Sequence, residues 1–277
     1  MANPNITLSM NTSTIRPTPL LEKIKAVGEA GFRAIELWND EMNTYLNGGG
    51  SLAELKRALA DYGLTVANVV GVGGWADVTD EAALAKAIEQ AKPNMAQAAE
   101  VGSPYIIAGP PRGECDLERA GRNYAALIEA GKALGITPAA EFLGFVGYVN
   151  TIDRCRRIVA AAAHPDACLV VDPFHIFRGG GSIDEIDQVP GERIAVFHFN
   201  DAPAHPDRAE QADKDRVFPG DGILPLVEWT RRIVGRGYRG VISLELFNPS
   251  HYERDPREVA KEGFRKMSRV LEAAGVL

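Results

Sequence analysis

Four residues whose side chains can bind a divalent cation lie near the ends of four successive apolar runs. They are Glu141, Asp172, His198 and Glu245. Runs rich in Val, Ile and Leu are typical of strands buried in a parallel sheet. Three carboxylates gathered at one point would repel one another unless a cation lay between them. Three oxygen ligands and one nitrogen suit Mn²⁺, Co²⁺, Zn²⁺ or Mg²⁺, with positions left for a substrate.

Each of these residues also has an ordinary explanation when taken alone. A single acid after a strand is often a helix cap or half of a surface ion pair, and a histidine within an apolar strand is often a core residue. The occurrence of all four on successive strands favours one shared site. Glu141, His198 and Glu245 also have apolar neighbours on both sides, where an uncompensated charge would be costly.

The elements that must position these residues alternate along the chain between short β-type runs and amphipathic segments. We expect strands at 6–10, 34–38, 64–72, 105–108, 138–143, 168–172, 194–199 and 241–246. We expect helices at 17–30, 51–62, 79–101, 116–134, 151–163, 182–189, 224–234 and 256–274. Pro93 should kink or divide the third helix, and Pro173 should end the sixth strand so that a loop turns over the site.

Eight β/α units in 277 residues, with no break in composition, predict a (β/α)8 TIM barrel that forms a single domain over residues 1–277. In such a barrel the carboxyl ends of the strands converge on one mouth, where active sites are built. A doubly wound sheet is the alternative. It lacks support because no G-x-G-x-x-G follows the first strand, and the glycine runs at 48–50 and 179–181 fit flexible loops better than phosphate cradles.

Composition narrows the class of protein. The net charge of −7 and the absence of a Lys/Arg run argue against a nucleic-acid partner. Three cysteines without a CxxC pair fit reduced thiols. The first five residues show no signal-peptide pattern, and no apolar run approaches the roughly 20 residues of a membrane span. We therefore expect a cytoplasmic protein with no membrane partner, and the sequence leaves homo-oligomerisation open.

The chain resembles the xylose isomerase-like TIM-barrel superfamily of sugar isomerases and epimerases, and within it the inosose (2-keto-myo-inositol) isomerases. The matching stretches are 140–144 (AEFLG), 170–175 (VVDPFH), 197–201 (FHFND), 215–222 (DRVFPGDG) and 243–247 (SLELF). They lie in the C-terminal half, while length and strand order agree over the whole chain. The ligand set is specific to the superfamily, and the RVFPG and ELF stretches narrow the resemblance to the inosose isomerases.

The resemblance implies one divalent metal ion held by the four residues at the strand ends. It also implies that His175 and Arg216 bind a small polyol or keto-sugar substrate. His175 follows the Asp172 strand within reach of a substrate hydroxyl, and Arg216 lies in a long loop suited to cover the mouth and hold an oxyanion. An exposed loop histidine and a surface arginine are the ordinary alternatives for these two residues.

The chemistry expected of such a site is proton transfer next to a carbonyl. The metal would stabilise an enediolate as a Lewis acid, and Glu141 or Glu245 would remove the α-proton, with the same or the opposite glutamate returning it. The reaction is then isomerisation of a ketose or inosose, or epimerisation of a ketose, as part of carbohydrate metabolism and inositol catabolism. No redox cofactor is expected.

Some residues depart from the inosose isomerase pattern or have an open role. Phe145 stands where a polar residue is expected, and the polar loop 11–14 keeps only part of the pattern. Both should line the substrate pocket and so bear on substrate identity. Trp38 and Trp75 could form an apolar wall or belong to the core. Glu36 could orient a group of the site or make an internal ion pair.

Other functions on the same barrel were weighed. A metal-dependent dehydratase of an inosose or a dehydroshikimate-like substrate would use the same enediolate, and the sequence does not separate it from an isomerase. An abasic-site endonuclease needs a histidine-rich site of several zinc ions and a basic face, whereas the chain has five histidines and is acidic. A metal-binding barrel without activity would require loss of a base or of a substrate-binding group.

Overall fold

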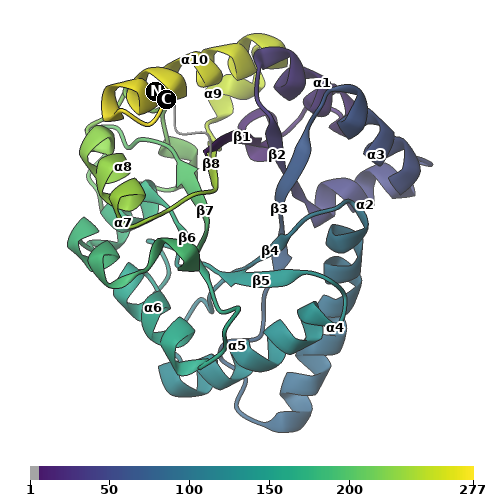
Figure 1. The fold of residues 1–277 in the computed structure, drawn as a ribbon, viewed down its shortest axis with the longest axis vertical. Coiled ribbons are helices and arrows are strands. Elements are labelled where there is room, and N and C mark those ends of the chain that lie inside the picture. Colours follow the sequence, from purple (N-terminus) through teal and green to yellow (C-terminus); the bar gives the residue numbers. More distant parts are fainter. Residues whose placement is uncertain (1–5) are drawn as a thin grey trace.

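The structure, a computed structural model, describes residues 6–277 and is a closed barrel of eight parallel strands. The strands follow one another around the barrel in chain order, and β8 pairs with β1 to close it. Helices surround the strands on the outside (Figure 1). The predicted (β/α)8 barrel is therefore confirmed. The expectation about a signal peptide falls on residues 1–5, outside the described part of the chain.

The eight strands are short and almost entirely buried, as expected of a sheet covered on its outer face by helices. They are β1 Thr7–Asn11, β2 Ala34–Trp38, β3 Thr65–Val72, β4 Tyr105–Ala108, β5 Thr137–Ala140, β6 Leu169–Val171, β7 Ile194–Phe199 and β8 Val241–Leu244. The longer helices of the outer ring are α1 Leu20–Ala30, α3 Leu52–Asp61, α4 Glu81–Glu100, α5 Leu117–Lys132, α6 Ile152–Ala161, α8 Leu226–Gly235 and α10 Pro256–Ala274.

Shorter helices occupy the loops and were not all expected. They are η1 Thr12–Ile15, α2 Asn39–Asn47, α7 Pro173–Gly179, η2 Ile183–Gln188, η3 Gly191–Arg193, η4 Asp213–Asp215 and α9 Pro249–Tyr252. The helix expected at 182–189 is a 3-10 helix in the structure. Such short pieces carry too few residues for a hydrophobic period to show in the sequence.

Two expectations about proline are wrong in part. The kink expected at Pro93 stays a prediction, but Pro93 does not divide its segment, because α4 continues through it as one helix. Its side chain is exposed, so the carbonyl that loses its hydrogen-bond donor can be hydrated. Pro173 begins a helix where we expected a loop, because it is the first residue of α7 and Asp172 is the N-cap. Proline suits that position since its fixed φ is helical and its missing N–H is not needed there.

Below the mouth the interior of the barrel is apolar on β5, β6 and β7, and it includes the buried Ser9 of β1 and Ser243 of β8. Side chains alternate between the two faces of a strand. Ala139, Val170 and Val196 therefore share the inner face of the barrel with three of the expected metal ligands, which lie two positions further along the chain. These three apolar residues belong to a small buried cluster with Ile107, Cys168 and Ala195. This cluster closes the barrel beneath the polar residues and shields them from water on that side.

Candidate active site

All four expected ligands lie at the mouth of the barrel. Glu141, Asp172 and Glu245 each come directly after a strand, β5, β6 and β8, and His198 lies near the end of β7. The strands thus bring together residues that are up to 104 positions apart, from 141 to 245. All four side chains are buried, so their charges must be balanced by one another or by a cation.

Three of the residues already form a group with metal-binding geometry. Glu141, Asp172 and His198 each offer a ligand atom, and these atoms lie within 4.8 Å of one another. His198 Nδ1 lies 3.3 Å from Glu141 Oε1, 3.4 Å from Asp172 Oδ2 and 3.1 Å from Glu245 Oε2. Glu245 therefore lies next to this group of three residues, beside His198.

His198 is oriented from behind by Glu36. Its Nε2 lies 3.1 Å from Glu36 Oε2, so an Nε2–H donates to this buried carboxylate. Its Nδ1 has no hydrogen-bond partner among residues 6–277. A histidine that donates one ring N–H to a carboxylate and aims the other nitrogen at three carboxylate oxygens is the usual arrangement of a metal ligand. The donor set thus fits a divalent cation.

The charges of the cluster shift its titration. Burial lowers the pKa of His198, but the carboxylates of Glu245 and Glu36 outweigh it and hold that pKa well above its ordinary value. Burial raises the pKa of Glu245 to about 8. Burial acts in the same direction on Asp172, yet Arg216 and His175 outweigh it and keep the pKa of Asp172 well below its usual range. Without a metal ion, the site therefore retains protons at neutral pH.

Arg216 reaches the same carboxylates from the long loop after β7. Its Nη1 donates to Asp172 Oδ2 at 2.9 Å and to Glu245 Oε2 at 2.7 Å, and its Nη2 donates to Asp213 Oδ1 at 2.6 Å. The guanidinium is buried, which corrects the alternative of a surface arginine. Three carboxylates share this one cation.

His175 lies in the first turn of α7 beside Arg216. Its Nδ1 accepts a hydrogen bond from the backbone N–H of Gly144 at 3.2 Å, and its Nε2 lies 3.0 Å from Arg216 Nη2. Burial lowers the pKa of His175, although Asp172 acts in the opposite direction. The side chain is buried, which corrects the alternative of an exposed loop histidine.

A pocket of about 300 Å³ opens onto these groups. Its polar lining comes from Glu141, His175, Asp213, Arg216 and Glu245. Its apolar lining includes Trp38, Val70, Val72, Leu143, Phe145 and Phe247. A polyol ring or chain can place its hydroxyl groups on the first set and its C–H face on the second.

Among the residues with an open role, some line this pocket and others do not. Phe145 does, as expected, and so does Trp38, whose role was left open. Trp75 is instead buried in the core against Tyr124, with ring centroids 5.3 Å apart. Loop 11–14 was expected to line the pocket, but none of its residues does. Asn11 and Glu36 lie directly behind the ligands.

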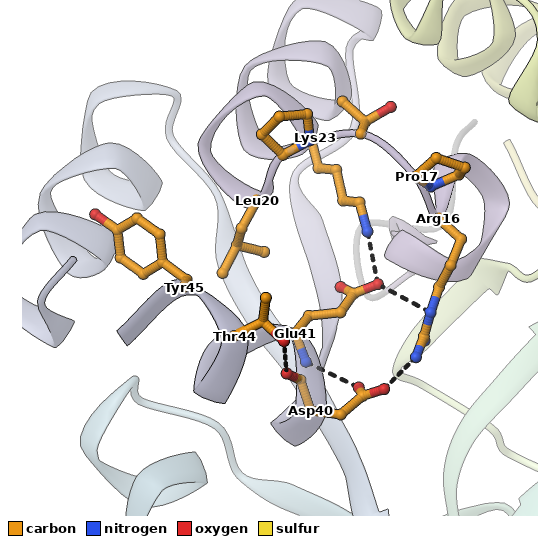
Figure 2. Close-up of a pocket in the computed structure, with 10 residues that line it drawn as sticks. Arg16, Pro17, Leu20, Lys23, Asp40, Glu41, Thr44 and Tyr45 are labelled. Atoms are coloured by element: carbon orange, nitrogen blue, oxygen red, sulfur yellow. Dashed lines mark hydrogen bonds and ion pairs between the residues drawn. The ribbon is translucent and has the colours of Figure 1, made fainter. Parts of the chain in front are cut away.

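A second pocket, of about 410 Å³, lies beside the mouth (Figure 2). Two cations and two carboxylates face one another in it: Lys23 Nζ donates to Glu41 Oε1 at 2.6 Å, and Arg16 pairs with Asp40. None of the expected site residues lines it. Its charges balance within the cluster, which packs the loop after β1 against the start of α2.

A family model for the xylose isomerase-like TIM barrel matches residues 24–270. The chain belongs to this family. A curated inosose isomerase of Halalkalibacterium halodurans is 31% identical over 189 residues, which cover 66% of this chain and 67% of the relative. A 3-dehydroshikimate dehydratase of Pseudomonas aeruginosa is 28% identical over 254 residues, which cover 90% of this chain but 39% of the relative. The chain therefore spans about two fifths of that dehydratase.

Solved structures show the same fold. The IOLI protein, whose crystal structure contains a bound zinc atom, superposes with a TM-score of 0.86 and 24% identity, covering 96% of this chain and 98% of that one. An L-ribulose 3-epimerase superposes with a TM-score of 0.77 and 19% identity, covering 99% of this chain and 96% of that one. No helix in the described part of this xylose isomerase-like barrel is long and apolar enough to cross a membrane.

Sequence reasoning missed a layer of asparagines behind the ligands of this xylose isomerase-like barrel. Asn11 donates to Glu36 and Glu245, Asn68 Nδ2 donates to Glu36 Oε2 at 2.7 Å, and Asn200 Nδ2 donates to Asp172 Oδ2 at 3.1 Å. A polar residue within an apolar run was the available signal for Asn68 in β3. Asn11 gave no such signal, because β1 also contains Thr7 and Ser9.

Proposed function

We propose that the chain is a divalent-metal-dependent isomerase or epimerase of an uncharged ketose or inosose. The observation that carries the proposal is the unpartnered Nδ1 of His198, which faces the carboxylates of Glu141, Asp172 and Glu245. The metal would be Mn²⁺, Co²⁺, Zn²⁺ or Mg²⁺ held by these four residues. Relatives named as inosose isomerases support the reaction class.

A metal ion bound there would supply Lewis-acid polarisation of a substrate ketone and its neighbouring hydroxyl. The protein supplies the proton transfer. Glu141 or Glu245 removes the proton from the carbon next to the carbonyl, and the electron pair moves onto the carbonyl oxygen. Return of a proton to the former carbonyl carbon, together with transfer of the neighbouring hydroxyl proton to the former carbonyl oxygen, completes an isomerisation. Return of the proton to the opposite face of the original carbon completes an epimerisation. No electron is gained or lost overall.

The other lining residues hold the substrate during this transfer. His175 and Arg216 lie next to Asp172 and Glu245, so they are placed to hydrogen-bond substrate oxygens as negative charge develops on them. Trp38, Phe145 and Phe247 form the wall for the C–H face. The apolar cluster below the mouth keeps water from the transferring proton.

A dehydratase acting on a dehydroshikimate-like acid is the second candidate, because such enzymes are among the relatives. The charge of the pocket favours the neutral substrate. Arg216 is the single cationic side chain in the pocket lining, and it is already paired with Asp172, Asp213 and Glu245. A substrate carboxylate would have to compete with these three for one guanidinium.

The proposal is tested by hydrogen exchange in D₂O. The protein is incubated with Mn²⁺ or Co²⁺ and a panel of neutral ketoses and inososes, and deuterium incorporation is followed by NMR. We expect exchange at the carbon next to the carbonyl of at least one substrate, and its loss in Glu245→Gln. The absence of both exchange and product throughout the panel would refute an isomerase, and unchanged exchange in the variant would refute the role of Glu245. Ultraviolet absorbance of an enone product, from an inosose or from dehydroshikimate, would instead identify the dehydratase.

A further inference from the structure

Asn11, the last residue of β1, connects the two sides of the candidate metal site. Its Nδ2 donates to Glu245 Oε1 at 2.9 Å and to Glu36 Oε2 at 3.2 Å. Glu245 is one of the proposed ligands, and Glu36 is the carboxylate that orients His198. The side chain of Asn11 is fully buried and does not line the substrate pocket. It therefore acts on the site only through other residues.

The orientation of the Asn11 amide is fixed by the donors on its oxygen. Oδ1 accepts from the indole Nε1–H of Trp38 at 2.7 Å and from the backbone N–H of Ser13 at 2.9 Å. Both partners are donors only, so the amide oxygen must face them and the NH₂ group must face the carboxylates. A flipped amide would place two donors against two donors and its oxygen against Glu36 and Glu245.

We propose that Asn11 is a positioning residue for Glu245 and that Trp38 sets its orientation. Because Oε1 is held by the amide, Oε2 is directed toward His198 Nδ1, 3.1 Å away. Without this hydrogen bond Oε1 has no partner, and the carboxylate is held through Oε2 alone, by Arg216 Nη1 at 2.7 Å and by His198. The carboxylate can then pivot about Oε2, and its geometry toward a metal ion or a substrate proton is less well defined. This role rests on the proposed function, since it concerns a proposed metal ligand and base.

The indole of Trp38 is itself held in place by a residue of the second pocket, Arg16. The Arg16 guanidinium lies 4.6 Å from the centre of the Trp38 ring, and Asp40 and Glu41 pair with that guanidinium (Figure 2). Trp38 also meets Phe247 edge to face, with ring centroids 5.9 Å apart. The tryptophan thus has two separable functions, because its ring forms pocket wall and its N–H orients Asn11.

Asn68 provides the matched control for Asn11. It is equally buried, carries the same amide and donates to the same Glu36 oxygen at 2.7 Å, but it has no hydrogen bond to Glu245. Asn11→Leu and Asn68→Leu therefore both remove a donor from Glu36, and only Asn11→Leu frees Glu245. Trp38→Phe is the second variant, because it keeps an aromatic ring in the wall while it removes the indole N–H together with part of the ring.

The variants are compared for thermal stability, for the visible spectrum of bound Co²⁺ at saturation, and for kcat and KM of the exchange reaction. We expect Asn11→Leu to lower kcat about 10- to 100-fold at saturating metal with little change in KM, and to change the Co²⁺ spectrum. The fall in kcat should be several-fold smaller for Asn68→Leu than for Asn11→Leu. Trp38→Phe should show both changes expected of Asn11→Leu, the lower kcat and the altered Co²⁺ spectrum, to a smaller extent.

The outcomes separate the two proposals. If the wild-type protein binds no Co²⁺ and catalyses no exchange, the proposed function fails, and the positioning role fails with it. If the wild-type protein is active but Asn11→Leu matches Asn68→Leu in kcat and spectrum, only the positioning role is overturned. Should Asn11→Leu not fold, an unchanged kcat and Co²⁺ spectrum in Trp38→Phe would overturn it instead.

Discussion

Metal binding to this barrel should release between one and two protons at pH 7. The carboxylates around His198 hold its pKa well above the ordinary value, so the imidazole carries a proton that a metal ion must displace. Glu245, with its pKa raised by burial to about 8, is also mainly protonated at pH 7 and can contribute a second proton. The two contributions are coupled, because a protonated Glu245 no longer raises the pKa of His198.

The pH dependence follows from the same two groups. Both pKa values are raised, so protons are bound below these values and metal affinity must rise with pH. Near pH 7 the affinity should rise by between about 10- and 100-fold per pH unit, because each displaced proton contributes a factor of about ten. The contribution of Glu245 to the release should fall as the pH passes about 8.

Titration calorimetry in buffers of different ionisation enthalpy measures this release directly. Glu245→Gln is the control, since it should release about one proton fewer at pH 7 while His198 still contributes its own. A metal affinity that did not change between pH 6 and pH 8 would refute the electrostatic description of the cluster. An equal release from the wild-type protein and Glu245→Gln would refute the part assigned to Glu245.

Three further changes test other parts of the structure. Glu36→Gln should weaken metal binding about 10- to 100-fold because it loses the carboxylate that orients His198; an unchanged dissociation constant would contradict this orientation. Glu41→Ala should lower the free energy of unfolding by about 3 kcal/mol, since it leaves Lys23 buried without its partner. Lys23→Met, which removes the buried charge, should cost much less in the same denaturant titration, and equal costs would contradict the reasoning. Asp201→Ala should raise KM about tenfold, because this carboxylate accepts four backbone N–H bonds, three of them from residues 220–224 just beyond Arg216; an unchanged KM would show that the loop is held elsewhere.

The fold was predictable because its signals are local and repeated. Each buried strand appears as an apolar run, and caps mark several helices, such as the capping box of Ser51 and Glu54 at the start of α3 and the left-handed Gly31 after α1. Glu141 and Glu245 were expected within the strands 138–143 and 241–246, but each strand ends one residue before its glutamate. The error is small, because the residue that follows a strand still lies at the mouth of the barrel.

The second layer of the site was less predictable because its contacts join distant parts of the chain. Nothing near Asn11 in the sequence indicates that it meets Glu245, 234 residues away. The role of Asp172 as the N-cap of α7 was hidden for another reason. The proline after it signals the end of a strand and the beginning of a helix equally well, and only the tertiary structure separates the two.

The hydrogen bond between Asn11 and Glu245 also bears on when the site can be completed during synthesis of the chain. It crosses the seam where the first strand pairs with the eighth, so one partner emerges from the ribosome early and the other near the end of synthesis. A nascent chain that has folded its first half holds Glu36 and Asn11 but none of the four proposed ligands. Glu141, Asp172 and His198 follow with β5, β6 and β7, and the proposed set is complete only when β8 adds Glu245 and closes the barrel. The proposed proton transfer by Glu245, and the hydrogen bond that holds this carboxylate, therefore depend on ring closure.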